Sequence, residues 1–300
     1  MWVSKFTHYC FNCCFSRGLL ADQASIYRKT ILFATFGRLF ERMKKLSVAI
    51  ITLNEERNIG RCLDSVRGLA DEIVVIDSFS TDKTEEICNS YSARFETHPF
   101  GGYIQQKQYA LDSCAYDYVL MLDADEAISE TLYKSITAEK EKDFPEMSYD
   151  MNRLTNYCGQ WIYHCGWYPD KKLRLFDKTK AFIGGQNPHD RVIPLSDSHR
   201  IKHIKGDLLH YSYYSIEEHY KQADRFATIA AKALAEKGKK SSVIYAGIKA
   251  IAKFVRNYII KAGFLDGLNG YIICKISAKE TWWKYYRVIE IQSAKDEKNR

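Results

Sequence analysis

The sequence predicts an α/β protein with a mixed, mostly parallel β-sheet flanked by helices, and three observations support this prediction. Short apolar runs alternate with segments of helical periodicity between residues 46 and 123. Polar and acidic residues follow directly after these runs, where ligands bind in open α/β sheets. The chain has 300 residues, 46% of them hydrophobic and 27% charged, which suffices for one large domain with appendages.

The predicted elements follow one another in regular order from Leu46. The strands are residues 46–53, residues 72–76, a short segment near Phe95 and residues 119–122. The helices pass through Ile59, Leu63 and Val66, through Glu86 and Ile87, and through Ala110 and Leu111. Ser80-Thr81-Asp82 offers capping side chains to the second helix. Strands that alternate with helices in this way form βαβ units, so we expect them to be parallel.

The regular alternation stops between residues 150 and 210. Aromatic, Gly and Pro residues are dense there and predict short antiparallel strands and loops that build one wall of a pocket. Residues 215–236 predict an Ala-rich helix. We therefore divide the chain into an N-terminal extension (1–45), a central α/β domain (46–236) and a basic helical C-terminal region (237–300).

Charge is segregated along the chain, although the net charge is only +7. Residues 1–45 hold eight Lys and Arg against two Asp and Glu, and residues 237–300 hold fourteen against five, so the ends carry +6 and +9. The totals of 44 and 37 leave 22 basic and 30 acidic residues for the central domain, which carries −8. This distribution does not suit nucleic-acid binding. It suits a metal-using enzyme held against an anionic surface.

Residues 1–42 predict a dispensable extension, because they contain neither a long apolar stretch nor a clean cleavage site, and Met43 stands just before the first strand. No apolar stretch reaches the roughly 18 residues that span a bilayer. The nine cysteines form no regular framework, so we expect a reducing, cytoplasmic environment.

The segment 243–262 predicts an amphipathic basic helix in the C-terminal region. One face carries Lys249, Lys253 and Arg256. The opposite face carries Ile244, Ile248, Ile251, Val255 and Ile259, and Trp282, Trp283, Tyr285 and Tyr286 follow later in the chain. One interpretation is a helix packed on the core with a solvated basic face. The coincidence of apolar, aromatic and cationic residues favours contact with an anionic membrane surface.

The acidic pair Asp123 and Asp125 carries the strongest chemical signal. Both follow the apolar run at residues 119–122, and residues i and i+2 of an extended segment point the same way. Two such carboxylates suit Mg²⁺ or Mn²⁺, and a divalent cation there can neutralise a diphosphate leaving group. A solvated acidic loop is the simpler interpretation of this motif taken alone.

Polar residues at the first two strand ends point to the same edge of the sheet. Asp77 follows the second strand, where an acid can accept hydrogen bonds from a ribose or a base. Thr52, Asn54 and Glu55 lie at the end of the first strand and face the same crevice. The alternatives are a turn role for Asp77 and a surface pair with Arg57 for Glu55.

Together and in this order, these segments resemble glycosyltransferase family 2. They read Leu46-Ser-Val-Ala-Ile-Ile-Thr-Leu-Asn-Glu-Glu, Val74-Val-Ile-Asp-Ser-Phe-Ser-Thr-Asp-Lys-Thr and Leu122-Asp-Ala-Asp-Glu. The resemblance covers roughly residues 46–290 and is greatest to bacterial transferases that add glucose or a related sugar to the lipopolysaccharide inner core. It implies the GT-A fold, a nucleotide-sugar donor (UDP-linked in most relatives) and an inverting reaction. The family's Asp-Asp-Gly-Ser-Thr-Asp element has Ser78 and Phe79 in place of its second acid and its glycine, so only Asp77 is carried over for nucleotide binding.

The resemblance also implies roles for later residues. Asp190, after Gly184-Gly185 and next to His189, matches the base that deprotonates the acceptor hydroxyl, or else His189 and Asp190 only orient a loop. Relatives use a His-Glu or similar pair there, so an aspartate shortens the side chain by one methylene. Arg174 contacts the diphosphate or the acceptor, or else forms a structural salt bridge. His210 is a third metal ligand beside Asp123 and Asp125, or else a buried structural histidine.

We therefore expect a metal-dependent transferase on the cytoplasmic face of the membrane, with a nucleotide-sugar donor and a membrane-borne glycolipid acceptor. Lipid-linked or capsular glycans are alternative acceptors. A haloacid-dehalogenase-type phosphatase fits less well, because there the Asp-x-Asp motif opens the domain and is followed by Gly-Thr or Gly-Val, whereas here Glu126-Ala127 follows. A non-catalytic scaffold is disfavoured by the presence of all four acids, Asp77, Asp123, Asp125 and Asp190.

Overall fold

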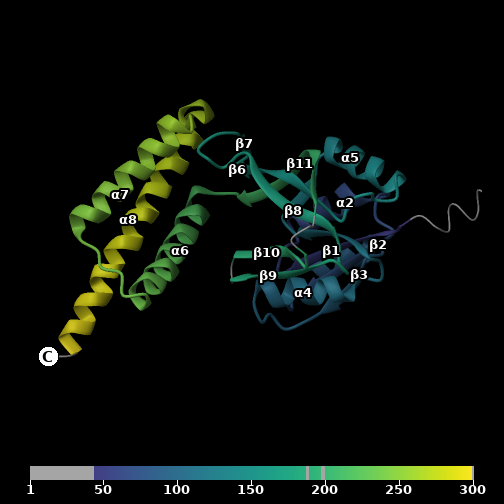
Figure 1. Ribbon diagram of the computed structural model, residues 1–300, viewed down its shortest axis with the longest axis horizontal. Coiled ribbons are helices and arrows are strands. Elements are labelled where there is room, and N and C mark those ends of the chain that lie inside the picture. The colour runs from purple at the N-terminus through teal and green to yellow at the C-terminus, as the bar shows by residue number, and fades with distance from the viewer. Residues whose placement is uncertain (1–43, 187–188, 197–199, 299–300) are drawn as a thin grey trace, which may run out of the picture. The chain divides into compact units, whose positions relative to one another are not determined.

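The computed structural model of the chain describes residues 44–186, 189–196 and 200–298 (Figure 1). The predicted N-terminal extension lies outside the described residues except for Lys44 and Lys45, and so does the predicted starting residue Met43. Asn187 and Pro188, within the segment that precedes Asp190, also lie outside them.

A nine-stranded sheet forms the centre of the described chain, in the order β3-β2-β1-β4-β8-β6-β11-β5, with β7 paired to β6. The strands are β1 (Leu46–Thr52), β2 (Glu72–Asp77), β3 (Arg94–Thr97), β4 (Tyr118–Asp123), β5 (Glu126–Ile128), β6 (Ser148–Tyr157), β7 (Gln160–Ile162), β8 (Asp170–Asp177) and β11 (Ile201–Tyr213). The first four are parallel to one another. The predicted fold class, a mixed and mostly parallel sheet with flanking helices, is confirmed.

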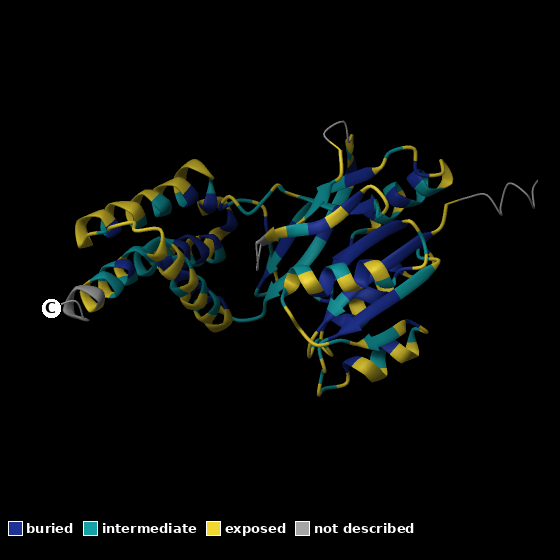
Figure 2. Cartoon of the chain, turned by 60° about the horizontal axis from the view of Figure 1, so that its bottom comes forward, coloured by how far each residue is buried: buried dark blue, intermediate teal, exposed yellow. Residues whose placement is uncertain are grey.

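Strands β1, β2 and β4 are largely buried on both faces, as Figure 2 shows by its dark strands. Val48 and Ile50 of β1 pack on one face with residues from α2 (Ile59–Val66) and α5 (Glu130–Glu141). Ala49 points to the other face and packs with Ala110 of α4 (Tyr103–Ser113). Successive strand residues point to opposite faces, so an unbroken apolar run is what a strand covered on both sides requires. The other helix of this half is α3 (Thr84–Ser90).

The second half differs from the short antiparallel strands predicted for residues 150–210. Strand β6 has 10 residues and β11 has 13, and the two are parallel to each other. Strand β8 runs antiparallel between β4 and β6, so the predicted antiparallel pairing is present there. A separate two-stranded ribbon is formed by β9 (Ala181–Gln186) and β10 (His189–Pro194). The Gly and Pro residues that suggested short strands lie mainly in this ribbon and in the turns.

Gly206 is required where β11 breaks its register with β6 between His203 and Asp207. Its φ is +103°, and a Cβ there would lie 2.3 Å from the backbone nitrogen of Leu132. We expect Gly206→Ala to destabilise the protein by about 3 kcal/mol or more, because helix α5 cannot move away without losing its packing. Gly159→Ala is the matched control, since its φ is +87° but nothing lies within 4 Å of the added atom. In urea unfolding, the control should lose about 1–2 kcal/mol of unfolding free energy because of its positive φ alone. Equal losses in the two variants would contradict the steric explanation.

From residue 216 onward, the described chain is a set of packed helices. They are α6 (Ile216–Glu236), α7 (Val243–Val255), the π-helical turn Arg256–Ile260, the 3₁₀ turn Gly263–Asp266 and α8 (Gly267–Lys298). Helix α6 begins with a capping box in which Ser215 and Glu218 bond each other's backbone. Both α6 and α7 pack on α8, so the predicted boundary at residue 236 falls between two helices of one group. Within the described residues, no helix combines the length and apolarity needed to cross a membrane.

Candidate active site

The carboxyl ends of β1, β2 and β4 lie side by side and bring the predicted strand-end residues together. Thr52 is paired with Asp77, and Ile51 is paired with Asp123. Ligands bind outside this edge of an open α/β sheet, so the geometry agrees with the position predicted for the site.

Asp77 shapes the loop after β2. It is buried, and its carboxylate accepts hydrogen bonds from the backbone nitrogen of Ser80 at 2.7 Å and from the Ser80 hydroxyl. Phe79, which stands where the family has glycine, has a φ of +65°, so the loop keeps a conformation that glycine favours at a cost of about 1–2 kcal/mol. Its ring is 56% exposed beside the predicted nucleoside-binding residue.

Asn54 joins the loops that follow β1 and β2. Its side-chain oxygen accepts a hydrogen bond from the backbone nitrogen of Thr81 at 2.8 Å, and its own backbone nitrogen donates to the Ser80 hydroxyl at 2.7 Å. The two loops therefore form one connected unit at the strand ends, as the shared crevice in the prediction requires.

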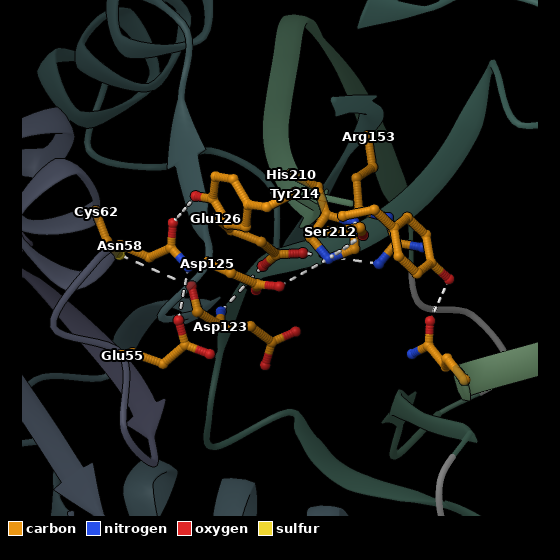
Figure 3. Close-up of polar contacts among 12 residues, drawn as sticks. Glu55, Asn58, Cys62, Asp123, Asp125, Glu126, Arg153, His210, Ser212 and Tyr214 are labelled. Carbon is orange, nitrogen blue, oxygen red and sulfur yellow. Dashed lines mark hydrogen bonds and ion pairs between the residues drawn. The ribbon is translucent and has the colours of Figure 1, made fainter. Parts of the chain in front are cut away.

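Glu55 lies within the electrostatic field of the acidic motif. Burial raises the pKa of the Glu55 carboxyl; the hydrogen bond that Asn58 donates at 2.7 Å opposes this, and the charges of Asp125, Asp82 and Asp123 raise it further. Asn58 is in turn bonded by the hydroxyl of Tyr214 (Figure 3). The interpretation of Glu55 as a surface partner of Arg57 is not supported, because the guanidinium of Arg57 lies over the Tyr214 ring, 3.3 Å from its centroid.

Asp123 is held between two cations. Lys107 Nζ lies 2.8 Å from Oδ1, and Arg174 Nη2 donates to Oδ2 at 2.8 Å. Burial alone would raise the pKa of Asp123, but the positive charges of Lys107 and Arg174 outweigh it and hold that pKa well below its usual range. Asp123 therefore stays ionised, with both carboxylate oxygens engaged in this structure.

Arg174 also binds Glu126, whose side chain is fully buried. Nη2 of Arg174 donates to Glu126 Oε1 at 2.9 Å, and Arg153 Nη1 approaches the same oxygen at 3.8 Å. The other oxygen of Glu126 accepts a hydrogen bond from the backbone nitrogen of Asp123 at 3.0 Å. Burial would lower the pKa of Arg174, but Glu126 and Asp123 raise it above its normal value. The salt bridge considered for Arg174 is thus present, and it includes a predicted site residue.

The carboxylate of Asp125 faces the imidazole of His210 (Figure 3). Nε2 of His210 lies 3.2 Å from Asp125 Oδ2, and the Ser212 hydroxyl lies 2.8 Å from His210 Nδ1. His210 belongs to β11 and is paired with Glu126 of β5, which places it beside the acidic motif although the two segments are far apart along the chain. The imidazole is partly exposed and lies next to the motif.

Asp190 reaches the same group from the β9–β10 ribbon. Its Oδ2 lies 2.9 Å from Nζ of Lys107, the ammonium that also contacts Asp123. Gly184 and Gly185 pair with Arg191 and Asp190 in this ribbon, and a Cβ on Gly184 would lie 2.5 Å from Ile193. The predicted base and the predicted donor-binding acid thus share one cation.

Two buried polar atoms in this region have no hydrogen-bond partner among the described residues: the hydroxyl of Thr52 and Nε of Arg174. Unpaired buried polar atoms are rare in folded proteins, so both atoms are suited to a polar ligand. In the part of the chain that the structure describes, no group of three or more His, Cys, Asp or Glu is arranged to hold a metal ion.

The sequence analysis missed Lys107 and Glu126. Lys107 is almost fully buried on α4, three residues before the buried Ala110. Residues three apart lie on the same face of a helix, so the sequence places Lys107 on the core face, which is unusual for a lysine. Glu126 directly follows the acidic motif, and its burial on β5 is visible only in the fold.

Comparisons with known proteins show the family of the chain. The pattern described as Glycosyl transferase family 2 matches residues 47–196. An uncharacterized glycosyltransferase of Rickettsia typhi is 33% identical over 239 residues, which are 77% of this chain and 82% of the relative. The chain belongs to glycosyltransferase family 2, as its motifs predicted, and its fold is the GT-A fold.

Two further similarities differ in strength. The lipopolysaccharide core biosynthesis glycosyltransferase LpsC of Rhizobium meliloti is 28% identical over 241 residues, covering 76% of this chain and 85% of the relative. The solved structure of TarS residues 1–349 from S. aureus is 17% identical, covers 81% of this chain and 91% of that chain, and has a TM-score of 0.41.

Proposed function

We propose that the protein is an inverting glycosyltransferase that moves glucose from a UDP-linked donor to a lipopolysaccharide core acceptor. The observation that supports this proposal best is the convergence of Asp190 and Asp123 on the ammonium of Lys107. A base for the acceptor and an acid for the donor must lie close to one reacting carbon, and both of these carboxylates contact the ammonium of Lys107.

The chemistry follows from these positions. Asp190 accepts the proton of the acceptor hydroxyl while that oxygen forms a bond to the anomeric carbon of the sugar. The bond from that carbon to the diphosphate breaks, and its electron pair leaves with the diphosphate. Attack from the side opposite the leaving group inverts the configuration. Asp77 and Thr52 are proposed to bind the nucleoside, with Asn54 and Glu55 completing that pocket. Arg174 is proposed to contact the diphosphate or the acceptor.

A divalent cation, Mg²⁺ or Mn²⁺, is proposed to be held by Asp125 and His210. Their facing atoms lie 3.2 Å apart, close enough for both side chains to contact one cation. When bound, such an ion neutralises the charge of the departing diphosphate. Asp123 was predicted as a further ligand; with both oxygens on Lys107 and Arg174, it could bind the ion only if one of those contacts were released.

The acceptor is proposed to be a membrane-borne glycolipid on the cytoplasmic face of the membrane. The relative named for lipopolysaccharide core biosynthesis supports this choice, since the match to it covers 76% of this chain. A lipid-linked or capsular glycan intermediate remains the alternative acceptor within the same chemistry.

Nucleotide binding tests the proposal first. UDP should raise the melting temperature in the presence of Mn²⁺, because a ligand at a hundred times its Kd stabilises the native state by about 2.7 kcal/mol. Asp125→Ala and His210→Ala should remove most of the Mn²⁺-dependent part of this shift. His203→Ala is the matched control, because His203 lies on the same strand and pairs with Asp150 outside the site. A shift with GDP but not UDP would change the donor, and no shift with any nucleotide would favour the non-catalytic scaffold.

A further inference from the structure

Helix α7, the turns that follow it and the start of α8 expose apolar residues, whereas the later part of α8 buries Ile273, Ile276 and Val288. On α7, Ile244 is 77% exposed, Ile248 61% and Ile251 66%. The exposed apolar surface continues through the turns that follow α7 and into the start of α8, with Ile259, Ile260, Phe264, Leu265 and Leu268. Figure 2 shows α7 largely in the colour of exposed residues, while α8 is mostly intermediate or buried. Helices surrounded by water turn such residues to the core, so an exposed apolar surface of this extent indicates a binding partner.

The packing of α7 explains why this surface is free. The helix contacts α8 through a side that carries small residues: Ala246 is buried, and a Cβ on Gly247 would lie 3.6 Å from the ring of Trp282. The later aromatic residues Trp282 and Tyr285 are half-buried, with Tyr285 packed on Tyr245 of α7. The helix is therefore not packed on the core by its isoleucines, which face outward.

The exposed charge around this surface is positive. Residues 243–268 contain four Lys and Arg against one acid, Asp266, which is buried. Lys249 and Arg256 are exposed on α7 and the turn after it, and Lys261 follows at the next turn. At about 100° per residue, Lys253 lies on the predicted basic face opposite the isoleucine row, and Lys249 and Arg256 lie between it and that row; both of these are exposed. An apolar centre with a cationic rim is complementary to an anionic lipid bilayer.

We propose that the surface formed by Ile244, Ile248, Ile251, Ile259, Phe264 and Leu268 (the apolar surface) inserts into the headgroup region of an anionic membrane. Lys249, Arg256 and Lys261 contact lipid phosphates at its rim. A second copy of the chain is a poorer occupant, because a two-fold interface would place the same acid-free basic rim against itself. The inference rests on the proposed function only for the membrane location of the acceptor; the helices contain none of the predicted site residues.

Vesicle sedimentation with the full chain tests this inference. We expect the protein to pellet with mixed vesicles of phosphatidylcholine and the anionic lipid phosphatidylglycerol and to bind pure phosphatidylcholine much more weakly. Ile248→Ser/Ile251→Ser should weaken binding to the mixed vesicles at least tenfold. Ile229→Ser, on the exposed side of α6, is the matched control and should bind like the wild type. Lys249→Gln/Arg256→Gln should remove the preference for the anionic lipid and the sensitivity to salt.

Three results would overturn the inference: a wild-type chain that stays in the supernatant, a double isoleucine variant that pellets like the wild type, or a dimer in sedimentation velocity that this variant dissociates. Mn²⁺-dependent hydrolysis of UDP-glucose in solution, measured on the same samples, reports on the transferase site alone. Vesicle binding without hydrolysis would therefore count against the proposed function, and hydrolysis without vesicle binding against the membrane surface.

Discussion

Asp190→Asn is expected to lower kcat for sugar transfer about a thousandfold while leaving UDP binding unchanged, because general-base catalysis typically contributes about 10²–10⁴ in rate. The amide cannot take a proton from the acceptor hydroxyl. It keeps the size of the side chain and can still accept a hydrogen bond from Lys107, so the β9–β10 ribbon should keep its place. Initial rates with UDP-glucose and a lipid acceptor, together with the UDP-induced melting shift, measure both quantities.

Two variants separate loss of the base from loss of structure. Asp190→Glu keeps a carboxylate and should retain more activity than Asp190→Asn, although its extra methylene displaces the base. Asp112→Asn changes an exposed acid of α4 whose side chain accepts a hydrogen bond from Gln108, and it should transfer sugar at the wild-type rate. Wild-type kcat in Asp190→Asn would remove Asp190 from the mechanism.

The parallel half of the fold could be predicted because its physical causes are local. The apolar run before Asp123 and the one before Asp77 are unbroken, as strands buried on both faces require, and parallel strand ends meet at one edge. The proximity of Asp190 to Asp123 came only from the resemblance, since no local pattern brings a ribbon from so much later in the chain to the same cation.

Sequence periodicity could not predict that the ammonium of Lys107 lies between Asp123 and Asp190. Lys107 occupies a core-facing position of α4, and whether a lysine there reaches a carboxylate depends on which strand the helix covers. The same holds for β11, whose 13 residues replace the short strands predicted between residues 150 and 210. Both features depend on contacts between distant segments.

Arg174→Met is expected to destabilise the protein by about 3–5 kcal/mol, the cost of leaving a buried charge without its partner. Glu126 has no exposed side-chain surface and accepts a short guanidinium contact from Arg174, whereas Arg153 is 3.8 Å away. Arg153→Met is the matched control: that arginine is 23% exposed and binds mainly Asp170, so its removal should cost about 1 kcal/mol. Urea unfolding at pH 7 compares the two variants with the wild type.

The pH dependence and a double variant separate charge from packing. The depressed pKa of Asp123 contributes stability that is complete above its ordinary value of 3.8 and is lost as the pH falls towards its lower folded-state value. Arg174 is one cause of that shift, so the wild type should lose more stability than Arg174→Met below pH 3.8. The difference in free energy of unfolding between the two proteins should therefore become smaller. Arg174→Met/Glu126→Leu should recover part of the loss at pH 7, because it removes the unpaired carboxylate. If the double variant is no more stable than the single one, the loss comes from packing around Arg174 and not from the buried charge.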